Sequence, residues 1–242
     1  MKLSPQEKAA RKAAFRAMSP QKKLEHIVTY YKWPILLGLI ALTVLGSVLH
    51  RQLTQKEPVL YTALLNTAVG EDLERALTDD YLRAFTYDVR RSEVYLYADL
   101  YLSDEADELN HEYAFASRMK FMGAVSAQKL DVVLMNREAY TLLSESGYLL
   151  PLDELASDAL LGPYLCQGEV VLSDNTLDYL LGETEAQERV TRLRTNAVSA
   201  LGMPLLRGAA FDGEIYLGVI ANSPRTEEAL RYLRYLAGSE AA

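Results

Sequence analysis

An uncharged apolar run of seventeen residues, Trp33–Leu49, constrains this chain more than any other stretch, because 24% of the sequence is charged. At ~1.5 Å per residue such a run forms a helix of roughly 26 Å, close to the ~30 Å hydrocarbon layer of a bilayer. A buried helix of a soluble core is the alternative, but it would carry more polar residues than Thr43 and Ser47. The sequence therefore predicts a transmembrane helix over residues 33–50, with ring-bearing and charged residues at its two edges: Tyr30, Tyr31, His50 and Arg51.

The distribution of charge predicts how this helix is oriented. Residues 1–33 hold eight Lys/Arg and two Glu, a net charge of +6, whereas the remainder holds seventeen basic and thirty-one acidic residues, a net of −14. The positive-inside rule then predicts a signal anchor in the cytoplasmic membrane, with a basic cytoplasmic helical arm at 1–32 and an extracytoplasmic domain after a stalk at 51–57. Cys166 is the only cysteine and lies far downstream, so the predicted outer domain has no disulfide framework.

The basic arm permits two interpretations. It is either a lipid-binding segment that is attracted to anionic headgroups of the bilayer or a plain topology signal, and the spacing of its charges favours the second. Nucleic acid is not expected as a partner, because the basic charge lies next to the apolar run and the bulk of the chain is acidic.

Residues 58–160 alternate between strand-like and helix-like segments. Three strands are predicted at 59–65, 94–102 and 130–135, and each is followed by a segment with helical features at 70–85, 103–127 and 137–146. A fourth strand at 214–221 precedes a final helix that ends near Gly238. This order predicts a doubly wound α/β domain with a mostly parallel sheet.

The alternation is interrupted at residues 161–208. Short strand-like segments lie there around a turn-rich middle, and no long amphipathic helix separates them. We therefore expect a small β-rich insertion or second lobe, so that the α/β domain consists of 58–160 and 209–242.

Three segments resemble extracellular solute-binding proteins of bacterial ABC importers. The first is the predicted strand Leu130–Asn136, which precedes a helix. The second is Gly147–Leu155, where the chain of those proteins crosses between lobes. The third is the closing segment Tyr216–Pro224, which is similar to their return strand. The resemblance covers roughly residues 58–155 and 213–238. It implies a periplasmic-binding-protein-like recognition domain without catalytic activity, here with a reduced second lobe.

The sequence offers little for catalysis or metal binding. No nucleophile elbow, phosphate-binding loop or dinucleotide fingerprint occurs, so we expect neither an enzyme nor a cofactor. Asp107 and His111 lie one helical turn apart, but two ligands do not make a metal site. The tyrosines at 95, 97 and 101 suit either stacking on a ligand or packing beneath a helix.

A ligand site is predicted at the carboxyl ends of the strands, where loops face helix N-termini. Polar residues follow the first, third and last predicted strands, and they are equally suited to be helix caps and turn residues. The candidate ligand-binding residues are Asn66, Thr67, Asn136, Arg137, Asn222 and Ser223.

Two functions therefore remain open from the sequence. The domain is either a solute-binding-like recognition module for a small ligand or partner protein, or a structural or assembly subunit of the cell envelope that docks other proteins. A tyrosine-lined cleft beside the insertion would favour the first, and an exposed apolar patch elsewhere would favour the second.

Overall fold

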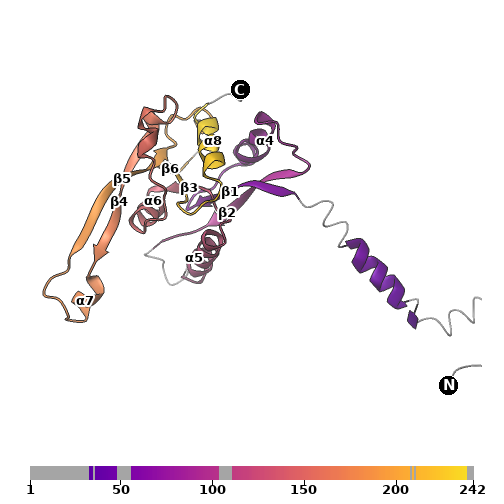
Figure 1. The fold of residues 1–242 in the computed structure, drawn as a ribbon, viewed down its shortest axis with the longest axis horizontal. Coiled ribbons are helices and arrows are strands. Elements are labelled where there is room, and N and C mark those ends of the chain that lie inside the picture. Colours follow the sequence, from indigo (N-terminus) through magenta and orange to yellow (C-terminus); the bar gives the residue numbers. More distant parts are fainter. Residues whose placement is uncertain are drawn as a thin grey trace, which may run out of the picture. The chain divides into compact units, whose positions relative to one another are not determined.

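The computed structural model of the chain describes residues 33–34, 36–47, 56–103, 111–207, 209 and 211–238. Two compact units divide the chain, one up to Gln55 and the other covering Lys56–Ala242. Within the first unit, the described residues 33–34 and 36–47 are helical (Figure 1).

The predicted membrane-spanning helix is wrong for the described residues, and this corrects the fold class and the single-pass signal anchor that included it. Within the described ranges, every helix is either too short or too polar to cross a membrane. The predicted basic arm at 1–32 lies outside the described residues, as do Asp107 and most of the predicted stalk, residues 51–55.

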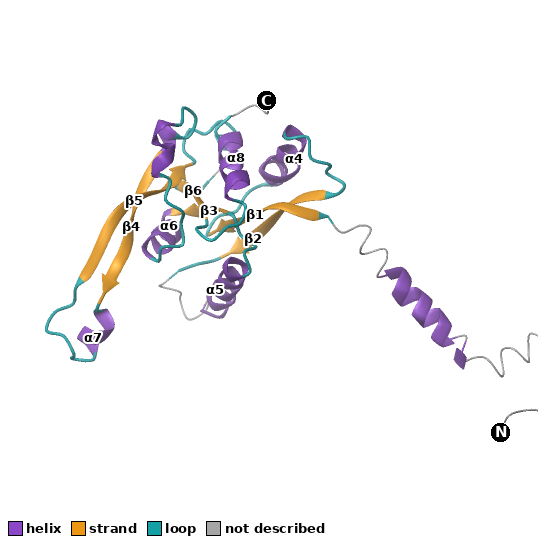
Figure 2. Cartoon of the chain, in the orientation of Figure 1, coloured by secondary structure: helices purple, strands orange, loops and turns teal. Residues whose placement is uncertain are grey.

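The second unit is an α/β structure built on one six-stranded mixed sheet (Figure 2). The order across the sheet is β2-β1-β3-β6-β5-β4. The first three of these strands run parallel to one another, and each remaining neighbour is antiparallel. The strands are β1 (Glu57–Leu65), β2 (Ser92–Leu100), β3 (Val132–Asn136), β4 (Leu165–Asp174), β5 (Arg189–Ser199) and β6 (Ile215–Val219).

This mixed sheet corrects the predicted doubly wound, mostly parallel arrangement. All four predicted strands share the sheet, but β6 runs against β3, with Val132 opposite Val219 and Asn136 opposite Ile215. The β-rich segment joins the same sheet, since β5 pairs with β6 through Val198 and Leu217. Beyond this junction, β4 and β5 continue as a two-stranded hairpin. This hairpin, residues 165–199, is here called the arm (Figure 2).

Helices cover both faces of the sheet because the strands are apolar on both sides. On one face, strand residues such as Leu60 and Leu134 pack against Tyr81 and Tyr232. On the other face, Ala63 and Met135 belong to a second cluster. The first face is covered by α3 (Glu71–Arg75), a π-helical turn (Ala76–Asp80), α4 (Tyr81–Ala84) and α8 (Thr226–Leu236), and the second by α5 (His111–Ser126) and α6 (Arg137–Glu145).

Short helices bracket the arm. Two 3₁₀ turns, Asp153–Ser157 and Gly162–Tyr164, precede β4. One turn of helix, α7 (Thr176–Leu180), follows β4 and begins the loop that returns to β5 (Figure 1).

Candidate functional site

The reversed direction of β6 separates the candidate ligand-binding residues into two groups. The carboxyl end of β3 lies beside the start of β6, so the loop after β6 emerges at the opposite ends of the strands. These two sets of strand ends are here called the two edges of the sheet. The structure therefore brings Asn66, Thr67, Asn136 and Arg137 to one edge and places Asn222 and Ser223 at the other.

The two asparagines at the first edge organise the backbone around them. Asn66, whose φ is +53°, accepts a hydrogen bond from the Leu102 N–H at 2.7 Å and donates one to the Leu102 carbonyl at 2.6 Å. Asn136 caps α6, because its Oδ1 accepts a bond from the Ala139 N–H at 2.9 Å. Thr67 is half-buried beside Asn66. The side-chain amides of Asn66 and Asn136 are thus engaged, the first in a turn and the second as a helix cap.

Arg137 is engaged with Glu214 at the start of β6. The two side chains form an ion pair in which Nε lies 3.1 Å from Oε2, and the Tyr216 hydroxyl donates to the same carboxylate at 2.7 Å. The hydrogen bond from Tyr216, and then Arg137, hold the pKa of Glu214 below its ordinary value. Glu214 also borders a hollow of about 430 Å³ beside the 200–215 loop.

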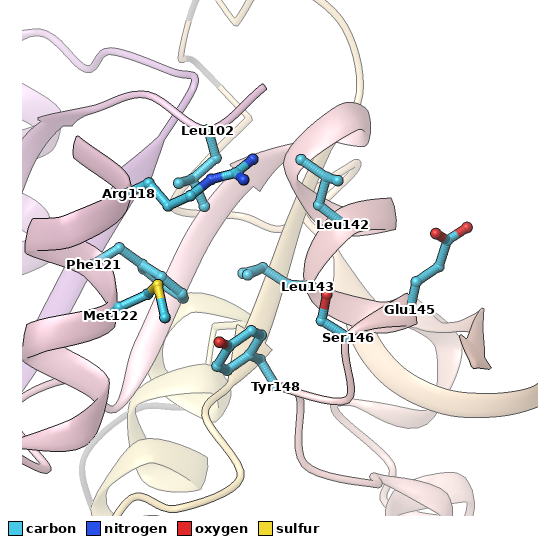
Figure 3. Close-up of a pocket in the computed structure, with 9 residues that line it drawn as sticks. All are labelled: Leu102, Arg118, Phe121, Met122, Leu142, Leu143, Glu145, Ser146 and Tyr148. Carbon is cyan, nitrogen blue, oxygen red and sulfur yellow. The ribbon is translucent and has the colours of Figure 1, made fainter. Parts of the chain in front are cut away.

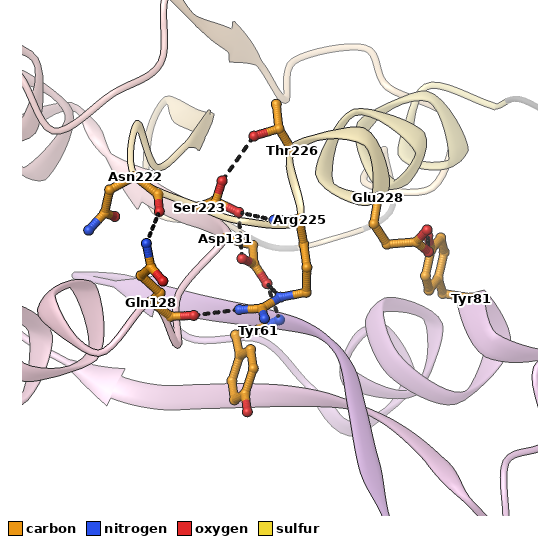
Figure 4. A network of polar contacts seen from close by, with 9 residues as sticks. All are labelled: Tyr61, Tyr81, Gln128, Asp131, Asn222, Ser223, Arg225, Thr226 and Glu228. Atoms are coloured by element: carbon orange, nitrogen blue, oxygen red, sulfur yellow. Dashed lines mark hydrogen bonds and ion pairs between the residues drawn. The ribbon is translucent and has the colours of Figure 1, made fainter.

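At the opposite edge, Ser223 belongs to a buried network around Asp131 (Figure 4). The Asp131 carboxylate is fully buried and accepts three hydrogen bonds, from the Ser223 hydroxyl at 2.6 Å, the Tyr61 N–H at 2.8 Å and the Arg225 Nε at 2.8 Å. Arg225 lies over the Tyr61 ring, 4.7 Å from its centroid. A buried carboxylate so supplied with donors is a structural clamp between β1, β3 and the start of α8.

Asn222 makes a separate contact to the end of α5. Its side-chain amide donates to the Val125 carbonyl at 2.9 Å, and its own carbonyl accepts a longer bond of 3.4 Å from Gln128. The predicted residues at this edge therefore fasten loops together, and sequence reasoning did not find Asp131, the residue at the centre of the network.

A hollow of about 270 Å³ lies between α5 and α6 (Figure 3). Six of its nine lining residues are apolar or aromatic, and they come from both helices and from the residues that follow β2 and α6: Leu102, Phe121, Met122, Leu142, Leu143 and Tyr148. Three polar residues, Arg118, Glu145 and Ser146, complete it. The position of this hollow, on a face of the sheet, was not predicted from the sequence.

The arm is fixed to α6 by buried hydrogen bonds at its root. The Tyr140 hydroxyl donates to Asn196 at 2.9 Å, Asn196 donates to Ser144 at 2.8 Å, and Ser144 donates to the Glu169 carbonyl at 2.7 Å. Burial raises the pKa of Tyr140, which keeps this hydroxyl protonated as a donor. The arm therefore projects from a defined junction.

The far end of the arm, residues 172–188, is here called the tip, and it exposes large apolar side chains. Leu180 is 74% exposed, and its neighbours are exposed to a similar degree. These side chains lie on the end of β4, on α7 and just after it: Leu172, Leu177, Tyr179, Leu180 and Leu181. Such a concentration of exposed apolar residues is typical of an interaction surface.

Polar side chains hold the tip together from within. The Asn175 amide donates to the Ala186 carbonyl at 2.9 Å and accepts from the Glu188 N–H. Gln187 donates to the Thr176 hydroxyl at 2.8 Å. Because these polar groups are engaged across the loop while the leucines face outward, the apolar surface is preorganised.

The described residues contain no group of three His, Cys, Asp or Glu side chains that are placed to hold a metal ion. His111 begins α5 and Cys166 lies half-buried near the arm root. Neither residue is thereby assigned a chemical role.

Comparison with known proteins gives no relative. No family model, curated protein or solved structure matches this chain.

Proposed function

We propose that the chain is a non-catalytic docking subunit that binds another protein through the tip of its arm. The observation that carries the proposal is the exposed cluster of Leu177, Leu180 and Leu181 on a loop whose own polar groups are satisfied. Leaving such a surface in water costs free energy that burial against a partner recovers, at about 25 cal/mol per Å² of apolar area.

The charge of the tip indicates the chemistry of the partner. Residues 170–188 contain five carboxylates and neither Lys nor Arg, and residues 56–242 as a whole hold sixteen basic and thirty-one acidic residues, a net of −15. Complementary charge accelerates encounter and excludes wrong partners. The partner is therefore a protein segment that carries Lys or Arg among large apolar side chains. An anionic lipid surface would be repelled.

The arm also supports this function in its construction. Its root is fixed to α6 through Asn196 and Ser144, and β5 continues into the central part of the sheet beside β6. A rigid support reduces the conformational entropy that docking costs. In this arrangement the β-rich segment extends the same sheet as the rest of the α/β domain.

Site-specific photo-crosslinking in the cell that naturally makes the protein tests the proposal. A photoreactive residue at Leu180 should give one discrete adduct, whereas the same residue at Leu201, which is 81% exposed away from the tip, should not. The crosslinked protein is then purified and titrated with the wild-type chain. Leu177→Asp and Leu180→Asp should each weaken that binding at least tenfold.

Reversing the charge of the tip tests whether its partner is basic. Glu183→Lys with Glu185→Lys should weaken binding, and added salt should reduce the wild-type affinity. An adduct of twice the chain mass would identify a second copy and refute the basic partner. Binding of the wild-type chain to anionic lipid vesicles, lost in Leu180→Asp, would refute a protein partner altogether.

A further inference from the structure

The outer side of β2 has no pairing partner in the described part of the chain. β2 pairs with β1 alone and ends the sheet at the side opposite the arm (Figure 2). The Arg91 carbonyl, just before the strand, accepts a hydrogen bond from the Glu57 N–H of β1 at 2.7 Å. Because backbone groups alternate in direction along a strand, those of Val94 and Leu96 point away from β1. Their N–H and C=O groups are therefore available to a further strand.

The sequence of β2 lacks the residues that commonly keep an outer strand single. Residues 92–100 contain neither proline nor lysine, Tyr95 at the middle is 43% exposed, and the bulge in β2 itself falls after Tyr97. The outer strand at the other end of the sheet, β4, is held by α6, whose Ser144 hydroxyl donates to the Glu169 carbonyl at 2.7 Å. β2 is thus the outer strand that is suited to pair with another chain.

The charges at the two ends of β2 indicate which chain that is. Arg90 and Arg91 precede the strand, and Asp99 lies near its end. Arg91 and Asp99 are exposed, and neither forms an ion pair within the ranges that the structure describes. A second copy of β2, placed antiparallel, brings the basic start of each strand beside the acidic end of the other. Opposite charges that face each other across two strands are stabilising.

A two-fold arrangement centred on Tyr95 also suits the backbone. Tyr95 then lies opposite Tyr95 of the second copy, and Val94 lies opposite Leu96 of the second copy. Since Val94 and Leu96 carry the outward-pointing groups, they form the hydrogen-bonded pairs of an antiparallel ladder, and the two Tyr95 residues form a non-hydrogen-bonded pair. The strand is therefore complementary to itself.

The side chains favour this register over its neighbours. It places Arg91 opposite Asp99 of the second copy, and Glu93 opposite Tyr97, whose hydroxyl has no hydrogen-bond partner among the described residues. A register that is centred one residue to either side separates Arg91 from Asp99. The register centred one residue later also sets Glu93 opposite Asp99, and like charges in that position are destabilising.

We infer that two copies of this chain associate through β2, antiparallel about Tyr95, so that their sheets join into one. This association goes beyond the proposed docking and does not depend on it, because the arm lies at the other end of the sheet. The dimer presents two arms, one at each end of the joined sheet.

Disulfide trapping in the full chain tests the register, with Cys166→Ser as the background. Tyr95→Cys should give a disulfide-linked dimer on mild oxidation, because the Cα atoms of a non-hydrogen-bonded pair lie ~4.5 Å apart. Tyr97→Cys should stay monomeric on a non-reducing gel, since its two copies lie four residues apart along the strands, ~14 Å. Glu93→Cys alone should also stay monomeric, but it should crosslink to a co-expressed Tyr97→Cys chain.

Two charge variants test the contacts. In the Tyr95→Cys chain, Arg91→Glu should raise the concentration at which half of the chains crosslink about tenfold, because it sets a second carboxylate opposite Asp99. Arg192→Glu, which changes an exposed arginine on the arm, should leave that concentration unchanged.

In the co-expressed pair of Glu93→Cys and Tyr97→Cys, Tyr95→Lys in both chains should abolish the adduct by placing two like charges opposite each other. Tyr113→Lys on α5, where Tyr113 is 51% exposed, is the control and should preserve it.

Three results would overturn the inference. Equal dimer yields from Tyr95→Cys and Tyr97→Cys would indicate random collision. Failure of Glu93→Cys to crosslink with Tyr97→Cys would exclude the register while Tyr95 itself is intact. An adduct that is unaffected by Tyr95→Lys, or a half-crosslinking concentration that is unaffected by Arg91→Glu, would show that β2 does not face a second copy in this way.

Discussion

The Nε of Arg225 donates to the fully buried carboxylate of Asp131 at 2.8 Å, across 94 residues of sequence. This ion pair joins the start of β3 to the loop before α8, and Arg225 itself keeps 28% of its side chain exposed. Removing one partner of a buried ion pair lowers the free energy of unfolding by more than the intact pair contributes to it, because the remaining charge stays buried without a partner.

Arg225→Met should therefore lower the free energy of unfolding by ~3 kcal/mol, as measured by urea denaturation. Arg75→Met, which removes one partner of an exposed ion pair with Asp72, is the control and should cost ~0–1 kcal/mol. The double variant Asp131→Asn with Arg225→Met should be less destabilised than the sum of the single changes. Additive effects would show that the two side chains do not interact.

Gly168 is required where the arm crosses α6. A Cβ at this position would lie 2.4 Å from the Ser144 Oγ and 2.6 Å from the Tyr140 hydroxyl, two atoms of the buried root. Gly168→Ala should cost ~1–3 kcal/mol of unfolding free energy through this overpacking. Gly123→Ala is the matched control, because Gly123 lies inside α5 with nothing within 4 Å of its added Cβ, and it should gain ~0.5–1 kcal/mol. Equal effects at the two glycines would contradict the close approach of arm and helix.

Asp158 gives the stability a defined pH dependence. Burial alone would raise its pKa, but hydrogen bonds from the Leu161 and Leu160 N–H groups and the Arg234 guanidinium outweigh burial and hold the pKa below its ordinary value. A carboxyl group with a depressed pKa stabilises the fold above its unfolded pKa of about 3.9 and loses this contribution as the pH falls through the folded value.

Asp158→Asn should consequently be less stable than wild type at pH 7, by ~1 kcal/mol or less because Arg234 is partly exposed. The difference should shrink as the pH falls from about 4 towards the lower pKa of the folded state, below which Asp158 is protonated in both states. Urea titrations at several pH values measure it, with Asp72→Asn as the control for charge removal. A difference that is independent of pH would exclude ionisation of Asp158 as its cause.

Thr62 carries a buried polar group that lacks compensation. Its hydroxyl lies in the middle of β1 and has no hydrogen-bond partner in the part of the chain that the structure describes. Thr62→Val keeps the branched shape and removes the desolvation cost, so it should raise the free energy of unfolding by ~1 kcal/mol. Thr78→Val, which removes an exposed hydroxyl bonded to the Glu74 carbonyl at 2.7 Å, should give no such gain. Destabilisation by Thr62→Val would indicate that the hydroxyl is satisfied in solution.

The strands of the sheet were predictable because apolar runs are a strong signal. The run at 59–65 became β1 (Glu57–Leu65) and that at 130–135 overlaps β3 (Val132–Asn136), whose Val133 is fully buried. The direction of β6 was not predictable, since a strand that is apolar on both faces has the same pattern in either direction. One reversed strand was sufficient to divide the candidate ligand site between two edges.

The clamp at Asp131 had one signal in the sequence. A charged residue directly before the apolar run 132–135 must find a partner if the run is buried. Arg225, however, is 94 residues away in the sequence, and nothing in the local pattern identifies it. The tip was equally inaccessible, because only the structure shows that its leucines face outward while its polar side chains are engaged within the loop.

The position of β6 has a consequence for the order in which the chain can fold during synthesis. β6 is the last strand to leave the ribosome, yet it lies between β3 and β5 in the sheet. Until it is inserted, β2-β1-β3 and the β4–β5 hairpin are two separate ladders with unpaired inner edges. A nascent chain therefore synthesises the arm early but cannot connect it to the sheet until the last strand arrives, and in that interval the unpaired inner edges of β3 and β5 are most open to premature association.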